Sequence, residues 1–318
     1  MPELPEVETI RIGLAKLLPG LEIKDVWHDW TKSFPNAPAD VKNFLIGAKV
    51  KEVRRRAKVL IIDLSTKYSL IIHLKMTGQL VFVSKNQQKL ETRKKKLVKK
   101  ANSQFLIPNS SEAGRFGGGH PTDSLIGKLP DKSTRVILTF KDGRRLFFND
   151  QRKFGWMRLL PTLEIPEIDF MKKVGPEPLE DDFTLKVFVE RLKRRQNSSI
   201  KAALLDQSVL AGVGNIYADE SLWAAKIHPT IPVKQVSRSK LANLYEAIPT
   251  ILCLAIEAGG STDRNYLDAQ GKKGSYLSLA KAFRKEGVPC PRCGTIIEKI
   301  RVAGRGTHIC PKCQKLTK

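Results

Sequence analysis

Four cysteines near the C-terminus constrain this chain more than any other feature. Cys290 and Cys293 form one C-x2-C pair and Cys310 and Cys313 form a second, with sixteen residues between the pairs. This spacing is typical of a zinc ribbon, in which each pair turns on a knuckle and four thiolates close a tetrahedron. Disulfides would need an oxidising compartment, whereas the chain starts with no apolar signal segment, so we expect an intracellular context. We predict one structural Zn²⁺, with no open position for a catalytic water.

The fifth cysteine and the basic residues between the two pairs have different expected roles. The fifth cysteine, Cys253, lies in the apolar run ILCLAIEA, and we expect a core residue rather than a ligand. Lys299, Arg301 and Arg305 fall between the two pairs, where a ribbon forms its hairpin. A metal-held hairpin with arginine near its tip suits phosphate contact or groove insertion. A solvated charged hairpin explains the same residues equally well.

The charge balance points to a polyanionic partner. Lys and Arg total 56 against 32 acidic residues, a formal net charge of +24. No apolar run approaches the roughly 18–20 residues needed to span a bilayer, so nucleic acid is a better partner than a membrane. Charge does not distinguish DNA from ribosomal RNA. The 318 residues and 41% hydrophobic content allow two domains with their own cores.

The first half of the chain has the pattern of a β-sandwich. Over residues 21–160, short β-branched and aromatic runs such as VLIIDL, LIIHL and RVILTF alternate with turns. We predict two mainly antiparallel sheets. The pattern lapses over about residues 85–130, where the charge run ETRKKKLVKK and the turn-forming GRFGGGHPTDS predict an irregular basic insertion.

The second half has helical periodicity. VGPEPLEDD is proline-rich and acidic, which predicts a hinge. FTLKVFVERLKR and SSIKAALLDQSVL predict two helices, the second capped by Ser198 or Ser199. A third helix follows GVGN, and residues 237–258 predict a fourth.

The opening MPELPEVETI has two interpretations. Removal of Met1, which a small second residue usually permits, would leave Pro2 with a secondary amine. An α-amino group has a reference pKa of about 7.7–8.0, so its neutral form can attack an aldehyde-level carbon and give an iminium. Glu3 and Glu6 are then close enough to transfer protons. Ordinary helix capping, with Pro5 at a first helical position, explains the same segment.

Three segments together identify a family. MPELPEVET, the stretch GVGNIYADE between helices and the four-cysteine ribbon occur with RRAKVL, IIHLKMTG, QRKFG, VGPEPL and IHP, in that order. This combination resembles the formamidopyrimidine-DNA glycosylase family from Met1 to Cys313, apart from the insertion. The resemblance implies a monomeric base excision repair enzyme that removes oxidised purines, chiefly 8-oxoguanine and formamidopyrimidines, from double-stranded DNA. It also implies strand cleavage by β,δ-elimination and a place in the cytoplasm, at the nucleoid.

The implied fold is α+β, with an antiparallel β-sandwich flanked by helices and a helix–two-turns–helix domain that carries the zinc finger. The implied domains are a catalytic β-sandwich domain over residues 1–163, with the insertion at about 85–130; a hinge over 164–182; a helix–two-turns–helix domain over 183–285, with a lesion-capping loop at about 259–277; and a zinc finger over 286–318.

The resemblance also implies roles for the residues that match the family's motifs. Pro2 would attack the sugar C1′ and displace the damaged base. Glu3 would act at the sugar ring oxygen and shuttle protons during elimination, and Glu6 would support the site. Lys58 and Arg305 would complete the catalytic set by holding phosphates next to the lesion.

A base inside a duplex must be extruded before its C1′ can be attacked, so a wedge has to fill the gap. Met76, Arg152 and Phe154 match the family's three wedge residues. By themselves Met76 and Phe154 look like strand-end core residues. Lys153 departs from the family pattern, because many members carry a second arginine there; phosphate charge is kept and bidentate geometry is lost.

Four further residues match DNA-binding positions of the family. Asn215 would bind phosphate at a helix N-terminus, where backbone N–H groups also point at the ligand. The others are His73, Lys201 and Tyr217. By itself, a lone histidine in an apolar strand is more often a satisfied core residue.

Three alternatives differ in class. A sister glycosylase acts on oxidised pyrimidines, but its opening usually differs from PELPEVET after the first two residues. A catalytically silent DNA-binding relative would not need Pro2, Glu3, Lys58, Asn215 and Arg305 together. A zinc-ribbon RNA- or ribosome-binding protein explains the charge and the cysteines but not the opening ten residues.

Overall fold

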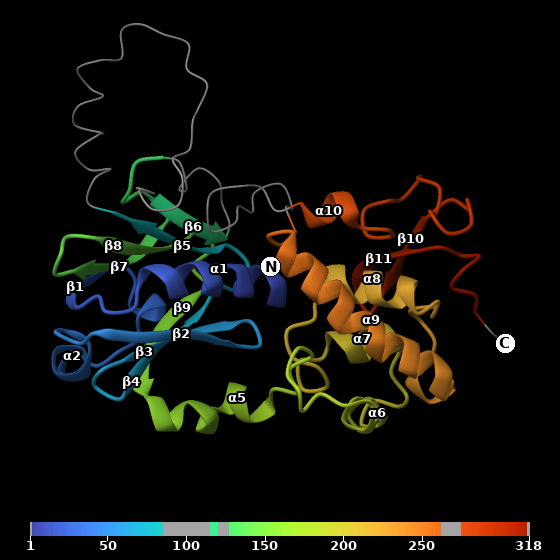
Figure 1. Ribbon diagram of the computed structural model, residues 1–318, viewed down its shortest axis with the longest axis horizontal. Coiled ribbons are helices and arrows are strands. Elements are labelled where there is room, and N and C mark those ends of the chain that lie inside the picture. The colour runs from blue at the N-terminus through green and yellow to red at the C-terminus, as the bar shows by residue number, and fades with distance from the viewer. Residues whose placement is uncertain (1, 85–114, 120–126, 262–274, 317–318) are drawn as a thin grey trace, which may run out of the picture.

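The computed structural model describes residues 2–84, 115–119, 127–261 and 275–316. Its first half is a sandwich of two antiparallel sheets (Figure 1), which confirms the expected fold class. The four-stranded sheet has the order β2 (Val50–Arg56), β3 (Val59–Leu64), β4 (Tyr68–His73), β9 (Trp156–Pro161). The five-stranded sheet has the order β1 (Ile23–His28), β7 (Thr134–Phe140), β8 (Arg145–Asp150), β5 (Gly78–Val83), β6 (Arg115–Gly119).

The core of the sandwich follows from the period-two pattern of its strands. Leu60 and Ile62 of β3 belong to one buried cluster with Leu80 of β5 and Phe148 of β8, from the opposite sheet. Helix α1 (Leu4–Leu17) adds its apolar stripe to the same cluster. The smaller elements of this half are η1 (Thr31–Ser33), α2 (Pro38–Asp40) and the π-helical η2 (Val41–Leu45).

Strand β6 corrects the predicted limits of the irregular insertion. Residues 115–119, with the sequence RFGGG, pair along β5 from Val83↔Arg115 to Gln79↔Gly119. A Cβ on Gly119 would lie 2.4 Å from the carbonyl oxygen of Gly78, so a side chain does not fit at this crossing. The glycines that suggested a loop therefore permit close strand pairing. The basic run ETRKKKLVKK lies outside the described residues.

The second half is helical and ends in a small hairpin. Its elements are α6 (Leu185–Lys193), α7 (Ile200–Leu205), α8 (Asn215–Ala224), η4 (Val233–Gln235), α9 (Arg238–Glu257), α10 (Tyr276–Leu279), β10 (Glu298–Val302) and β11 (Arg305–Ile309). Ser199 caps α7 by accepting a hydrogen bond from Ala202 N at 3.3 Å. Among the helices of the described ranges, none is long and apolar enough to cross a membrane.

The expectation for Cys253 is wrong. This thiol is exposed on α9, whereas Ile248, Leu252 and Ala255 of the same helix are buried. Buried positions at helical spacing define one face, and Cys253 lies off it despite its apolar neighbours in the sequence.

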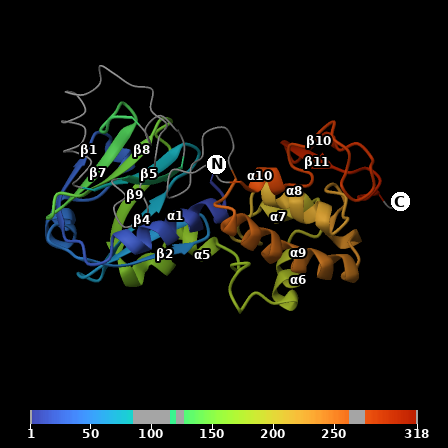
Figure 2. The ribbon, with the colours of Figure 1, turned by 45° about the horizontal axis from the view of Figure 1, so that its top comes forward.

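The predicted hinge, residues 164–182, includes most of η3 (Thr162–Glu167) and all of α5 (Asp169–Lys173), and it contacts both halves. On one side, the Glu177 carboxylate accepts a hydrogen bond from Arg55 Nη1 at 2.7 Å. On the other, Gly175 N donates to the carbonyl oxygen of Gln207 at 2.8 Å. The start of the chain lies between the two halves in both views (Figures 1 and 2).

Candidate active site at the junction of the two halves

The N-terminal segment is fixed at the junction before α1 begins. Glu3 N donates to Glu6 Oε2 at 2.9 Å, which closes half of a capping box. Leu4 N donates to the carbonyl oxygen of Gly212, from the second half, at 3.0 Å. Pro2 is buried beside them, and Met1 lies outside the described residues. Glu3 and Glu6 therefore cap α1 and also lie beside Pro2, so the two interpretations of this segment are compatible.

Glu3 is held in a state suited to proton transfer. Its Oε1 accepts a hydrogen bond from Ile216 N, in the first turn of α8, at 3.2 Å. Its Oε2 is buried without a hydrogen-bond partner among the described residues. Burial raises the pKa of Glu3 to about 7, although the Lys58 charge opposes the shift. A carboxyl group in this range carries a proton part of the time at neutral pH.

The turn before α8 approaches Glu3 so closely that a side chain at position 214 would displace the Glu3 carboxyl group. A Cβ on Gly214 would lie 2.3 Å from the Cδ atom of Glu3. Because Gly214 precedes Asn215 and Ile216, one short turn places both the hydrogen-bond donor to Glu3 and a polar side chain at the junction.

Glu6 is held by three donors from the second half. Its Oε1 accepts hydrogen bonds from Tyr217 Oη at 2.6 Å, Ser261 N at 2.8 Å and Ser261 Oγ at 2.9 Å. Burial and the neighbouring carboxylates raise the pKa of Tyr217 well above its ordinary value, so this phenol stays a donor. Ser261 lies near the start of the expected lesion-capping loop, at about 259–277, of which residues 262–274 lie outside the described residues.

Lys58 projects from a tight turn between β2 and β3. Ala57 in this turn has a φ of 52°, a left-handed conformation that is uncommon outside glycine. The carboxylate of Glu177 holds the turn by accepting the Ala57 N–H, and Arg56 Nη1 lies 3.1 Å from the same side chain. The segment predicted as a hinge thus fixes the backbone beside Lys58.

The Lys58 ammonium faces the Glu3 site. It donates to the carbonyl oxygen of Val213 at 3.0 Å, and the residue is 5% exposed. Burial lowers the pKa of Lys58; the Glu3 and Glu6 charges oppose this shift, and the Arg305 charge adds to it. The electrostatic coupling places these four side chains in one neighbourhood.

The hairpin of β10 and β11, here called the zinc hairpin, brings Arg305 close to Glu3 and Lys58. Arg305 is exposed at the start of β11, and Asn215 Nδ2 donates to the carbonyl oxygen of the next residue, Gly306, at 3.0 Å. Lys201 is fully buried instead, with its Nζ 2.5 Å from Asp219 Oδ1 and 2.7 Å from Thr307 Oγ1. Of the expected phosphate contacts, Arg305 is therefore open to solvent, whereas Lys201 is turned inward.

His73 is placed as a neutral, packed side chain. Its Nδ1 accepts a hydrogen bond from Lys75 N at 3.0 Å, and its ring centroid lies 5.8 Å from that of Trp156. Burial, together with the Lys75 and Lys58 charges, lowers the pKa of His73 to about 3. The imidazole is therefore uncharged at neutral pH.

The three expected wedge residues lie on two joined loops. Met76 is 40% exposed and Phe154 is 52% exposed, and the Arg152 guanidinium lies 4.8 Å from the Phe154 ring centroid. The buried Asp150 carboxylate accepts hydrogen bonds from Thr77 Oγ1, from Arg152 N at 3.2 Å and from Gly155 N at 2.6 Å, which joins the loops. Large exposed apolar side chains on a fixed base are suited to insertion between bases.

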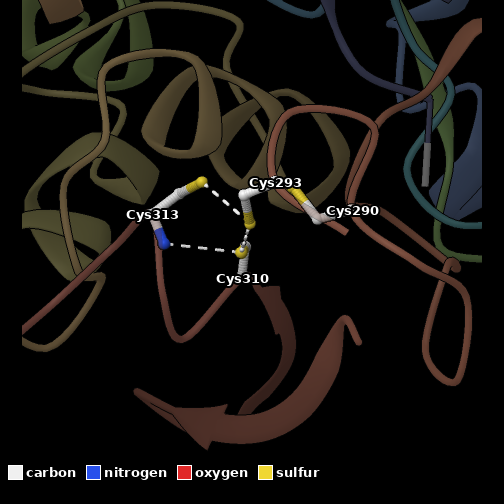
Figure 3. A group of neighbouring side chains, drawn as sticks. All are labelled: Cys290, Cys293, Cys310 and Cys313. Atoms are coloured by element: carbon white, nitrogen blue, oxygen red, sulfur yellow. Dashed lines mark hydrogen bonds between the residues drawn. The ribbon is translucent and has the colours of Figure 1, made fainter. Parts of the chain in front are cut away.

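The four cysteines converge as the spacing predicts. Their sulfur atoms all lie within 4.8 Å of one another, and the thiols point toward a common centre (Figure 3). Cys293 N donates to the carbonyl oxygen of Cys290 at 3.2 Å and Cys313 N to Cys310 Sγ at 3.4 Å, as expected for two knuckles. The donor set is four thiolates, which fits structural Zn²⁺.

Comparisons with known proteins agree with this geometry. Three family models match consecutive parts of the chain: the formamidopyrimidine-DNA glycosylase N-terminal domain at residues 1–157, the formamidopyrimidine-DNA glycosylase H2TH domain at 174–266, and a zinc finger found in FPG and IleRS at 287–316. The chain belongs to the formamidopyrimidine-DNA glycosylase family. The formamidopyrimidine-DNA glycosylases of Ligilactobacillus salivarius and Herpetosiphon aurantiacus are 38% and 39% identical to it, over 99% of this chain and 99% and 100% of theirs.

Solved structures of the family are similar over the whole chain. A mutant of Lactococcus lactis FPG bound to a Fapy-dG containing DNA has a TM-score of 0.79 and 34% identity, and Lactococcus lactis Fpg bound to an abasic site containing DNA has 0.78 and 33%. Each match covers 99% of this chain and 100% of the other.

Several residues that organise this family member's site were not predicted from the sequence. Glu177, Asp150 and Asp219 are buried carboxylates that hold the Lys58 turn, the wedge loops and the zinc hairpin, and Ser261 fixes Glu6. Glu177 stands in the VGPEPL segment and Asp150 precedes QRKFG, so position within motifs was the available signal. Asp219 carries no such signal beyond its place in GVGNIYADE.

Proposed function

We propose that this chain is a bifunctional DNA glycosylase and AP lyase of base excision repair, which removes oxidised purines and then cleaves the strand. The observation that carries the proposal is the Pro2–Glu3 pair at the junction: Pro2, whose nitrogen becomes a secondary amine when Met1 is removed, is next to a buried carboxyl group whose pKa is raised to about 7. The Fapy-dG containing DNA in the complex of a relative supports the substrate class.

Base removal uses the amine and the acid together. The neutral Pro2 nitrogen attacks C1′ as the bond to the damaged base breaks. The nitrogen gives up its proton, which leaves with the base. Ring opening then breaks the C1′–O4′ bond, and Glu3 donates its proton to O4′ as the iminium forms. Oε2 of Glu3 is the atom available for this transfer, because it has no hydrogen-bond partner among the described residues, whereas Oε1 is held by Ile216 N.

Strand cleavage follows from the iminium. Its positive charge acidifies the C2′–H bond, so the Glu3 carboxylate can take that proton while the 3′-phosphate leaves. A second elimination at C4′ expels the 5′-phosphate, and hydrolysis of the imine returns Pro2 as an amine. The reaction needs neutral Pro2 and protonated Glu3 at its start, so we expect a bell-shaped pH dependence of base removal.

DNA binding rests on three side chains around this centre: Arg305 is exposed, Asn215 is partly exposed, and Lys58 is buried but has a single hydrogen-bond acceptor among the described residues. Arg305, Asn215 and Lys58 hold phosphates at the lesion, and Met76, Arg152 and Phe154 fill the stack from which the base is extruded. Lys201, Tyr217 and His73 support the site without contacting DNA, because each is buried and hydrogen-bonded to other groups of the protein. Cys290, Cys293, Cys310 and Cys313 hold Zn²⁺, which stabilises the hairpin of Arg305 and takes no part in the chemistry.

The enzyme acts as a monomer on damaged double-stranded DNA. We place it in the cytoplasm at the nucleoid, because its substrate is chromosomal.

The test is an incision assay on three matched duplexes: 8-oxoguanine opposite cytosine, thymine glycol opposite adenine, and an undamaged control. We expect incision of the first, with phosphate left at both ends of the gap, and loss of base removal in Glu3→Gln. Faster incision of thymine glycol would instead assign the chain to the pyrimidine-specific class. Binding to 8-oxoguanine DNA without incision by the Met1-free wild type would contradict an enzymatic function.

A further inference from the structure

Asp219 is the central contact between α8 and the zinc hairpin. Its Oδ1 lies 2.5 Å from Lys201 Nζ, and its Oδ2 accepts the backbone N–H of His308 at 2.9 Å and lies 3.2 Å from His308 Nδ1. The carboxylate is fully buried. A single acid therefore joins α7, α8 and β11.

The three residues that follow Arg305 are each held from this side. Asn215 Nδ2 binds the carbonyl oxygen of Gly306, Lys201 Nζ binds Thr307 Oγ1, and Asp219 binds His308. The Arg305 guanidinium itself has no hydrogen-bond or ion-pair partner in the described part of the chain, so its direction depends on its strand.

The geometry of β11 determines on which side of the strand the Arg305 side chain lies. Arg305 and Thr307 are two residues apart on β11 and therefore share one face. Because Thr307 points at buried Lys201, Arg305 leaves the strand on the same side, toward α7 and α8. That side also carries Glu3, whose charge influences both Lys201 and Lys58.

We infer that Asp219 is a positioning residue that aims Arg305 at the DNA phosphates through Lys201 and His308, without touching DNA itself. The inference rests on the proposed role of Arg305 as a phosphate contact. Loss of the Asp219 charge would leave the Lys201 ammonium buried and unpaired, and the hairpin would shift to hydrate it. Arg305 would then lose its direction while the zinc ligands stay in place.

A double-mutant cycle tests this dependence. Dissociation constants are measured at one fixed salt concentration for wild type, Asp219→Asn, Arg305→Ala and the double variant, on a duplex with a tetrahydrofuran abasic-site analogue opposite cytosine. We expect Asp219→Asn to weaken binding about tenfold when Arg305 is present, and less than twofold when it is absent. Ser221→Ala, a buried substitution two residues along α8, is the matched control and should leave binding unchanged.

The outcomes separate this inference from the proposed function. An equal loss in both backgrounds, or no loss in either, overturns the positioning role of Asp219 alone. An unchanged affinity in Arg305→Ala overturns the phosphate role of Arg305 first, and the inference with it. Zinc content is measured for each protein; if Asp219→Asn does not fold, Thr307→Val enters the same cycle and must show the same dependence on Arg305.

Discussion

Lys58 and Lys201 are both buried lysines, and both match phosphate-binding positions of the family, yet the structure uses them differently. The Lys201 ammonium lies against Asp219 and Thr307 and is completely enclosed. The Lys58 ammonium has a single hydrogen-bond acceptor among the described residues, the carbonyl oxygen of Val213. An ammonium has three protons to donate, so Lys58 keeps donors for a ligand, whereas Lys201 directs its own to the protein.

The comparison teaches that burial alone does not mark a functional lysine. What separates the two regions is whether the protein supplies the acceptors. The Lys201 region is a satisfied ion pair that joins two segments of the fold. The region of Lys58 and Glu3 contains desolvated groups with unfilled hydrogen-bonding capacity, which favours binding and catalysis over stability.

The largest effect on stability should come from breaking the ion pair of Lys201 and Asp219. Lys201→Met leaves the Asp219 carboxylate buried without its cation, so we expect the free energy of unfolding to fall by about 3–5 kcal/mol. Urea unfolding of the zinc-loaded protein measures this. Adding Asp219→Leu should recover only part of the loss, because both buried charges are then removed but the His308 N–H loses its acceptor. A loss below about 1 kcal/mol for Lys201→Met would remove the distinction between the two lysines.

The same kind of substitution at the other lysine should affect the reaction instead. Lys58→Gln removes a charged donor beside Glu3, and we expect the single-turnover rate of base removal to fall about 100-fold, with stability unchanged or increased. Rates on an 8-oxoguanine duplex and melting temperatures are measured on one preparation. A destabilised variant with normal turnover would reverse the assignment of Lys58.

The region of Lys58 and Glu3 can also be tested through the pH dependence of stability. Its pKa is raised from 4.5 to about 7 by burial, so the folded state binds this proton more tightly than the unfolded state. Its contribution to stability is complete below pH 4.5 and is lost as the pH rises through 7. The stability advantage of Glu3→Gln over wild type should therefore grow between pH 5 and pH 8 and reach about 3 kcal/mol at pH 8. Melting temperatures at both values test this; an advantage that shrinks with rising pH has the wrong sign.

The smallest effect should come from the neutral partner of Lys201. Thr307→Val removes two hydrogen bonds, one with Lys201 Nζ and one with the carbonyl oxygen of Arg305, but keeps the Asp219 ion pair and the shape of the side chain. We therefore expect a loss of about 1–2 kcal/mol in unfolding free energy. Thr31, an exposed threonine in the β-sandwich half, offers a matched Thr→Val control. A loss as large as that of Lys201→Met would mean that the ion pair is not the main interaction.

Spacing and periodicity predicted much of the fold. The cysteine pairs gave the metal centre, the alternating runs gave both sheets, and Ser199 marked the start of α7. Strand β6 was missed because glycines were taken as turn formers, although here they permit close strand pairing. Cys253 was misplaced because apolar neighbours were counted without their helical phase, which puts Leu252 and Ala255 inside and the thiol outside.

The site was predictable only in part, for a physical reason. Motifs identified Glu3, Lys58 and Arg305, but not which of the matching side chains have free hydrogen-bonding groups. The inward direction of Lys201 and Tyr217 depends on acceptors more than fifteen residues away along the chain, at Asp219 and Glu6. Such partners appear only when the elements pack.

Borohydride trapping on a duplex with one 8-oxoguanine opposite cytosine tests the nucleophile most directly. The adduct is mapped by mass spectrometry, with Pro2→Gly and a Met1-retaining form as controls. We predict a covalent adduct on the nitrogen of Pro2 in the Met1-free protein, strongly reduced in Pro2→Gly and absent when Met1 is retained. Normal base removal with the adduct on Lys58, or with no adduct at all, would contradict the Pro2 mechanism.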